Sequence, residues 1–279
     1  MDNVELESLL KVESSLRPVA VLASDLAAGV RIAPHVHRRG QLLHAIHGVM
    51  IVRAPGGSWV VPQGRAVWVP AGVEHEIEAT AGPVATRTVF IEPGFLRGPE
   101  LAACRVIGVT PLLRQLIVTA VDELPLDYPE GGREERLMNL IADEIERAPA
   151  LGLHLPMPTA PRLASLCRAF LDNPAADASL ADWARQAHLT EKTLARQFLK
   201  ETGLNMGAWC RQARLLLSLP ALAAGRSVLD VALSHGYDSP SAFSAAFRRA
   251  FGISPIQYIK GEAGAAMDVI GGPALRECE

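Results

Sequence analysis

The sequence predicts an α+β protein of several domains, with an N-terminal antiparallel β-barrel, a helical hairpin and a C-terminal all-α part. Three observations support this prediction. Short β-branched runs separated by turn residues fill residues 18–95, apolar residues at helical spacing follow over 111–148, and a helical pattern continues through 162–260. A chain of 279 residues with 49% hydrophobic composition is long enough to bury more than one core.

Composition excludes several classes of protein. No run of eighteen apolar residues is present, which argues against a membrane span. The acidic start MDNVELESLL lacks the basic and apolar regions of a secretory signal. Four scattered cysteines form no CxxC pair, as is typical of reduced thiols: Cys104, Cys167, Cys210 and Cys278. We therefore expect a cytoplasmic protein.

Charge is distributed unevenly along the chain. Residues 161–260 hold 12 Lys and Arg against 7 Asp and Glu, a balance of +5, and the remaining residues hold 15 against 23, a balance of −8. This asymmetry suggests that only the C-terminal part meets a polyanion. Chance variation of a solvated surface explains the charges at least as well, so the motifs must decide.

The N-terminal half divides at turns and prolines. Turn residues such as Gly48, Gly64 and Gly72 separate the short strands, a pattern typical of a sandwich or small barrel. A Pro/Gly turn over 125–132 separates the two helices of a hairpin, and three prolines predict a linker over 150–161. The expected bounds are 1–108 for the barrel, 109–149 for the hairpin, 150–161 for the linker, 162–262 for the all-α domain and 263–279 for a fraying tail.

The all-α domain contains an internal repeat at an offset of 49 residues. Its matched positions are Leu194 with Phe243, Phe198 with Phe247, Gly203 with Gly252, and Trp209 with Tyr258. Such a repeat is typical of a duplicated supersecondary unit. The repeated glycine would end a helix in each copy, because glycine adopts a positive φ without strain.

Each copy has the parts of a helix-turn-helix. Ser179 and Ser227 are placed to cap the first helix of each copy, and Thr190 and Ser239 to cap the second. A second helix of this kind fits the major groove of B-DNA, and two on one rigid body could enter successive grooves roughly 34 Å apart. The competing interpretation is an ordinary helical bundle with solvated charges, which the agreement between the two copies disfavours.

The exposed positions of the two second helices are the predicted DNA contacts. Arg196 could pair with guanine through two hydrogen bonds, whereas Lys200, Arg248 and Arg249 are better placed for phosphates. The full predicted set is Glu191, Lys192, Thr193, Ala195, Arg196, Lys200, Ser239, Pro240, Ser241, Ser244, Ala245, Arg248 and Arg249.

The segment DVALSHGYDSPSAFSAAFRRAFGISPIQYIK resembles the signature of the AraC/XylS family of transcription regulators. The family's first half is similar to ASLADWARQAHLTEKTLARQFLKETGLNMGAWCRQARLLL, so the resemblance covers about residues 160–260. It implies two helix-turn-helices joined by a long helix, here roughly Met206 to Ala224. Pro220 departs from this pattern, because proline inside a helix usually kinks or breaks it.

Two N-terminal segments, GVRIAPHVHRRGQLLHAIHG and GRAVWVPAGVEH, resemble the two motifs of the cupin family. The resemblance implies a barrel in which His35, His37, an acidic residue and His75 bind one metal ion. In this chain Gln41 stands where the family has glutamate, and Ala79 where it has asparagine.

Residue spacing supports such a site. On a strand, His35 and His37 would point to one face, Gln41 would keep their parity if no bulge intervenes, and His75 could arrive from a neighbouring strand. This set could hold a divalent transition metal such as Zn, Ni, Fe(II), Cu or Mn, and the spacing does not choose among them. A metal-free pocket whose histidines bind an effector is an equally open interpretation, and purely structural histidines are a third.

The leading hypothesis is a ligand-responsive, sequence-specific DNA-binding transcription regulator that is not an enzyme. A small-molecule effector or metal in the barrel would alter DNA binding, and the hairpin would form the seam of a homodimer, as the family resemblance implies. RNA polymerase is a further candidate partner. There are two alternatives. The first is a cupin metalloenzyme, either a dioxygenase or an isomerase, with a DNA-binding appendage. The second is an architectural DNA binder without a sensor.

Overall fold

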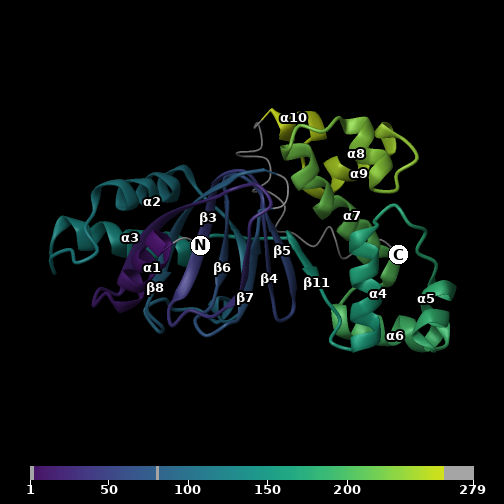
Figure 1. The fold of residues 1–279 in the computed structure, drawn as a ribbon, viewed down its shortest axis with the longest axis horizontal. Coiled ribbons are helices and arrows are strands. Elements are labelled where there is room, and N and C mark those ends of the chain that lie inside the picture. Colours follow the sequence, from purple (N-terminus) through teal and green to yellow (C-terminus); the bar gives the residue numbers. More distant parts are fainter. Residues whose placement is uncertain (1–2, 80–81, 261–279) are drawn as a thin grey trace. The chain divides into compact units, whose positions relative to one another are not determined.

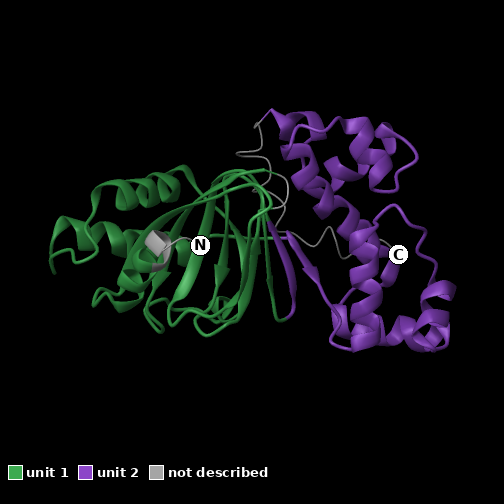
Figure 2. Ribbon diagram, in the orientation of Figure 1, with its two compact units in different colours: residues 1–55, 61–151 green, residues 56–60, 152–279 purple. Residues whose placement is uncertain are grey.

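The structure, a computed structural model, describes residues 3–79 and 82–260 of the chain. It divides into two compact units, residues 1–55 with 61–151 and residues 56–60 with 152–279 (Figures 1 and 2). The predicted tail over 263–279 lies outside the described residues. Within the described part, every helix is too short or too polar to cross a bilayer.

The strands form two antiparallel sheets, which confirms the predicted β-domain (Figure 1). The six-stranded sheet has the order β1 (Val19–Leu26), β8 (Val84–Ile91), β3 (Gly40–His47), β6 (Arg65–Val69), β9 (Arg105–Gly108) and β10 (Ala150–Leu151). The five-stranded sheet has the order β11 (His154–Pro156), β5 (Gly57–Val61), β4 (Met50–Ala54), β7 (His75–Glu78) and β2 (Arg31–His35). Gly48 turns the chain between β3 and β4 at φ 79°, where an added Cβ would lie 2.3 Å from the carbonyl oxygen of Pro83.

The predicted helical hairpin is confirmed as α2 (Pro111–Glu123) and α3 (Arg133–Arg147). Thr110 caps α2 by accepting a hydrogen bond from the backbone N–H of Leu113 at 3.0 Å. Apolar side chains of both helices pack with the six-stranded sheet in one buried cluster, which includes Leu42, Trp68, Val89, Leu113, Ile117, Met138, Ile141 and Ile145. Hairpin and sheet therefore share a core, and the first unit extends past the boundary expected at residue 108.

Four elements are absent from the sequence-based prediction. Helix α1 (Asn3–Ser14) precedes the first strand, and a short 3-10 helix (Pro99–Ala102) precedes β9. The segment predicted as a linker over 150–161 forms strands β10 and β11, which pair with β9 and β5. Its prolines are compatible with pairing because β11 is an edge strand, where a residue without an N–H leaves no ladder partner unsatisfied.

The second unit contains the predicted helical repeat. Its helices are α4 (Pro161–Asp172), α5 (Leu180–Ala187), α6 (Glu191–Thr202), α7 (Met206–Ala223), α8 (Val228–Ser234), α9 (Pro240–Phe251) and α10 (Pro255–Ile259). Each predicted cap accepts a hydrogen bond from the backbone N–H three residues later: Ser179, Thr190, Ser227 and Ser239. Gly203 and Gly252 end α6 and α9 with φ angles of 73° and 75°, as predicted.

Equivalent aromatic pairs stabilise each of the two copies internally. The ring centroids of Phe198 and Trp209 lie 5.9 Å apart in the first copy, and those of Phe247 and Tyr258 lie 5.8 Å apart in the second. Both pairs are T-shaped, an arrangement that adds to the free energy gained by burial. The offset in the sequence is therefore reproduced as a repeated packing unit.

Helix α7 continues through Pro220 to Ala223, so the break expected at this proline does not occur. Pro220 lies in the last turn of the helix, where its missing N–H removes a single hydrogen bond and the remaining turn is short. The carbonyl oxygen of Pro220 still accepts from the N–H of Ala224 at 2.9 Å. The long connecting helix implied by the family resemblance is therefore present.

We expect Gly203→Ala to lower the free energy of unfolding by about 1 kcal/mol, because an L-residue at positive φ is strained. No atom lies within 4 Å of the added Cβ, so backbone strain accounts for the whole effect. Gly207→Ala is the matched control in α7 and should stabilise the chain by about 0.5–1 kcal/mol. Urea unfolding of both variants measures the difference, and changes of the same sign would contradict the prediction.

Candidate metal centre and nucleic-acid interface

Three histidines meet where strands β2 and β7 pair. His35 ends β2 and lies opposite His75, the first residue of β7. His37 follows in the turn that leads to β3. The ring centroids lie 4.9 Å apart for His35 and His37, 4.3 Å for His35 and His75, and 5.5 Å for His37 and His75.

Strand alternation does not produce this arrangement, contrary to the sequence-based argument. Strand β2 ends at His35, and its register with β7 shifts between Ile32 and His35. The turn after β2 therefore sets the direction of His37. Gln41 lies on β3 in the other sheet, and its Oε1 is 2.9 Å from Nε2 of His75. All four predicted residues are therefore close together, although His37 is positioned by a turn and not by strand alternation.

Each of the three imidazoles has an oxygen near its Nδ1 atom. A neutral imidazole carries a single N–H, so an acceptor at Nδ1 favours the tautomer that leaves the lone pair on Nε2. Such outer contacts typically orient histidines that bind metals. The three distances are 2.8 Å from His35 to the carbonyl of Ala33, 3.1 Å from His75 to the carbonyl of Val73, and 3.0 Å from His37 to Oε1 of Glu13.

Burial keeps two of the rings neutral. It lowers the pKa of His75 to about 4, and it lowers the pKa of His37 to about 4 with a further contribution from the neighbouring His35 and His75. Burial also raises the pKa of Glu13, against the opposing effect of Arg38 and Arg39. The 3.0 Å contact between Nδ1 of His37 and Oε1 of Glu13 thus involves a neutral ring, and it does not form a hydrogen bond.

These residues fit a divalent transition metal. The ligand atoms of His35, His37 and His75 lie within 4.8 Å of one another. A zinc ion bound at about 2.0–2.1 Å from each nitrogen requires nitrogens no more than about 4.2 Å apart, so a small inward movement of the rings would complete the site. Since Nδ1 of His75 already faces a carbonyl, the neutral ring has no second N–H for Oε1 of Gln41. Two facing lone pairs suit a shared cation, and without one the Gln41 amide must rotate to donate.

Glu13 is the site residue that sequence reasoning missed. It lies in α1, far from either histidine motif in the sequence, and no pattern of spacing marks it. Only the packing of α1 against β1 brings its carboxylate to His37.

His44 and His47 lie outside this cluster. His47 is exposed, whereas His44 is fully buried with its Nδ1 3.2 Å from the carbonyl oxygen of Arg65. Burial lowers the pKa of His44 to about 4, and its Nε2 has no hydrogen-bonding partner among the described residues.

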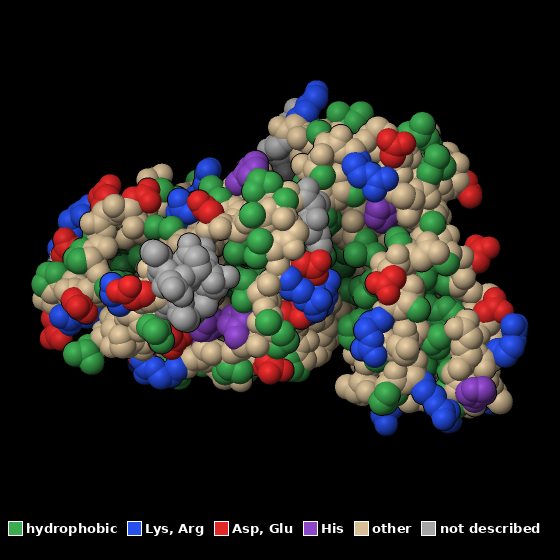
Figure 3. All heavy atoms as spheres, viewed as in Figure 1, with side chains coloured by type: hydrophobic (Ala, Val, Ile, Leu, Met, Phe, Trp, Pro, Cys, Tyr) green, Lys and Arg blue, Asp and Glu red, His purple; other side chains and the backbone are tan. Residues whose placement is uncertain are grey.

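The predicted DNA contacts lie on the second helix of each copy, outside the core. On α6, Leu194 and Phe198 are buried, whereas Arg196 and Lys200 are exposed. The other exposed members of the predicted set are Glu191, Lys192, Ser241, Ala245, Arg248 and Arg249, and the half-buried ones are Thr193, Ala195, Ser239, Pro240 and Ser244. Figure 3 shows Lys and Arg side chains gathered over the part of the second unit where α5 and α6 lie.

The basic side chains of α6 and α9 are available for a partner. Lys192, Arg196, Lys200, Arg248 and Arg249 form no ion pair with another residue of the described part. The hydroxyl oxygen of Ser239, by contrast, accepts from the N–H of Ala242 and serves as the cap of α9.

Comparison with known proteins identifies both parts of the chain. The family model of an AraC-like ligand binding domain matches residues 19–141, and that of a helix-turn-helix domain matches residues 183–261. The HTH-type transcriptional regulator NimR of Escherichia coli K12 is 35% identical over 225 residues, which cover 81% of each chain.

Solved structures with similarity include the DNA-binding domain of AdpA in complex with a target DNA, at 28% identity and a TM-score of 0.34 over 35% of this chain and 89% of that chain. ToxT from Vibrio cholerae with a bound unsaturated fatty acid aligns at 11% identity and a TM-score of 0.37 over 88% of this chain and 96% of that chain.

We expect stability to fall as the pH drops from 7 to 5, because burial lowers the folded-state pKa of His44 to about 4, below the 6.5 of a histidine in the unfolded chain. The unfolded chain binds more protons in this window, so acid favours unfolding, by about 2 kcal/mol for this group at pH 5. His44→Gln keeps a donor for the carbonyl of Arg65 and removes the titration. Urea unfolding at several pH values should show a shallower loss in this variant; identical slopes would contradict the assignment.

Arg196→Ala should weaken binding to a cognate site about tenfold or more, with a much smaller loss on random DNA, because a bidentate contact to guanine contributes about 1–3 kcal/mol of discrimination. Lys200→Ala should weaken both by the same factor, as expected for a phosphate contact. Fluorescence anisotropy with a site selected from genomic fragments measures both losses. An equal loss on both DNAs in Arg196→Ala would make Arg196 a phosphate contact.

Proposed function

This chain belongs to the AraC family of helix-turn-helix transcriptional regulators, and we propose that its three-histidine cluster receives the regulatory signal. It is a DNA-binding regulator with an AraC-like ligand-binding domain. In this proposal His35, His37 and His75 hold a divalent transition-metal ion, and Gln41 provides a neutral oxygen beside it. The observation that carries the proposal is the meeting of three imidazoles whose ligand nitrogens all lie within 4.8 Å of one another, each with an oxygen atom beside its Nδ1.

Metal binding accounts for this arrangement better than a metal-free effector pocket does. An organic effector would be recognised by a mixture of donors and acceptors, whereas this cluster presents lone pairs from neutral rings. The ligand atoms are also close enough to share a single ion. Imidazole nitrogens suit Zn, Cu, Fe and Ni, and this donor set does not choose among them.

The response would be a change in DNA binding. A bound ion alters the DNA-bound population only if its affinity differs between two arrangements of the protein. We propose that these arrangements belong to a homodimer joined through α2 and α3. Two apolar side chains of the hairpin, Leu112 and Leu140, are 50% and 37% exposed, which supports a seam at this position. We further propose that RNA polymerase is a partner of this protein and that the protein is cytoplasmic.

In this proposal the ion serves binding rather than catalysis. Support comes from the second unit, because an enzyme such as a dioxygenase has no use for two DNA-reading helices. Oxygen uptake by metal-loaded protein in the presence of candidate phenolic substrates would favour the metalloenzyme instead.

Calorimetric titration with Zn²⁺, Ni²⁺ and Co²⁺ should show one ion per wild-type chain, and the affinity for an operator fragment should change on loading. His75→Ala should lose at least tenfold in metal affinity and lose the DNA response, with metal-free DNA binding unchanged. His47→Ala removes an exposed histidine of the same domain and should behave as wild type. Wild-type protein that binds none of the three ions, or binds DNA equally with and without them, would contradict the proposal.

A further inference from the structure

We propose that Glu13 supplies the metal site with the carboxylate that Gln41 does not provide, by holding His37 through its Nδ1 atom. This inference rests on the proposed function, because it concerns the same three histidines. With neutral rings and a neutral amide, a divalent ion would bring two uncompensated positive charges into a largely buried site. Burying unpaired charge is costly, so a nearby carboxylate would raise the affinity for the ion.

Glu13 is the carboxylate in position to do this. Its Oε1 is buried, lies 3.0 Å from Nδ1 of the buried His37, and has no hydrogen-bonding partner among the described residues, so it is free to accept from this ring. The carboxylate is not close enough to all three ligand atoms to join the group that could share an ion. In this proposal it is an outer contact of His37 that would accept the Nδ1 proton once a metal ion takes the Nε2 lone pair.

Glu76, which follows His75, is an alternative carboxylate and is buried, whereas Glu74, which precedes His75, is exposed. The two carboxylate oxygens of Glu76 are already engaged by arginines: Oε2 lies 2.6 Å from Nη2 of Arg31, and Oε1 lies 3.2 Å from Nη1 of Arg53. Adjacent strand residues point to opposite faces of a sheet, so Glu76 faces away from His75 and cannot serve the site.

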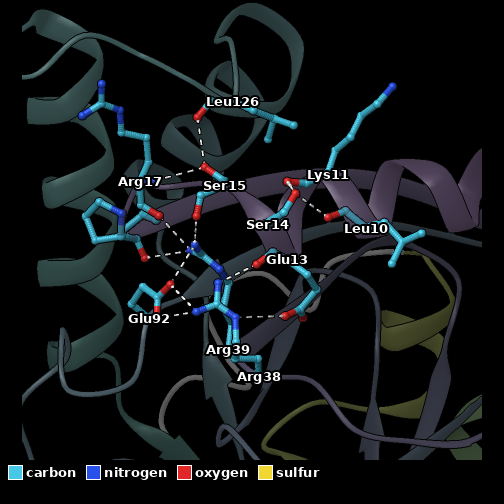
Figure 4. Close-up of polar contacts among 12 residues, drawn as sticks. Leu10, Lys11, Glu13, Ser14, Ser15, Arg17, Arg38, Arg39, Glu92 and Leu126 are labelled. Atoms are coloured by element: carbon cyan, nitrogen blue, oxygen red, sulfur yellow. Dashed lines mark hydrogen bonds and ion pairs between the residues drawn. The ribbon is translucent and has the colours of Figure 1, made fainter.

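Two arginines hold Glu13 in place (Figure 4). Arg38 and Arg39 directly follow His37, so the turn that carries the histidine also anchors the end of α1. Arg38 donates to the backbone carbonyl of Glu13, and the fully buried Arg39 donates to the carbonyl of Ser15 at 2.6 Å. Oε1 of Glu92 lies 3.1 Å from Nη1 of Arg38 and 2.9 Å from Nη2 of Arg39, which fixes both guanidinium groups.

This clamp makes Glu13 a positioning residue for His37. An ion on Nε2 would draw electron density from the ring and strengthen its Nδ1–H as a donor to Glu13. The carboxylate would then contribute both orientation and charge. Removing outer partners of this kind typically lowers metal affinity by roughly 10–100-fold.

Zinc titration of the full chain tests this proposal with two variants and one control. Glu13→Gln keeps an acceptor of nearly the same size without the charge, and we expect about tenfold weaker zinc binding. Glu13→Ala removes both features and should bind zinc up to about 100-fold more weakly. Glu130→Gln is the matched control, because Glu130 pairs with Arg17 at 2.8 Å in the same region and contacts none of the three histidines. It should bind zinc as wild type does.

A second readout separates positioning from general stability. Long-range ¹H–¹⁵N NMR spectra of zinc-loaded wild type should show His37 protonated at Nδ1, and Glu13→Ala should weaken or move this signal while His75 is unchanged. Melting temperatures of the metal-free proteins identify a variant that fails to fold, in which case the near-isosteric Glu13→Gln gives the result. Wild-type zinc affinity in both Glu13 variants would overturn this inference alone, whereas absence of zinc binding by the wild type would overturn the proposed function as well.

Discussion

A buried guanidinium group is the constraint on which the arrangement of the N-terminal site depends. Arg39 has no exposed surface, and a buried charge is tolerated only when it is paired and hydrogen bonded. Its side chain donates to the carbonyls of Ser15 and Arg17 and pairs with Glu92. These partners lie directly after α1, just before β1 and directly after β8. Satisfying one arginine therefore brings three separate segments to the turn between β2 and β3.

The histidine cluster follows from this arrangement. His35 reaches the site through the antiparallel pairing of β2 with β7, and His37 through the turn that Arg38 and Arg39 anchor. Burial keeps His37 and His75 neutral, because the charged form of an imidazole loses its hydration there. In the proposed metal site, the same burial that disfavours a histidine cation would leave neutral rings with lone pairs for a metal cation.

The two helix-turn-helix copies share their packing and differ in their surfaces. Phe198 with Trp209 and Phe247 with Tyr258 occupy equivalent positions at nearly equal distances, so duplication has kept the core. The exposed faces have diverged. Helix α6 presents Lys192, Arg196 and Lys200 along its length. Helix α9 begins with small side chains and carries its arginines in its last turn. This contrast suggests base reading by α6 and mainly backbone contact by α9.

The sequence by itself determined the features that depend on local pattern. Turn residues and β-branched runs gave the strands, capping residues and glycines gave the helix ends from Ser179 to Gly252, and the repeat gave the paired helix-turn-helix units. Only the tertiary structure decided the strand pairing of residues 150–161, the unbroken helix at Pro220 and the approach of Glu13 to His37. Edge pairing, packing around a proline and a contact between distant segments all depend on neighbours in space, which periodicity along one segment does not encode.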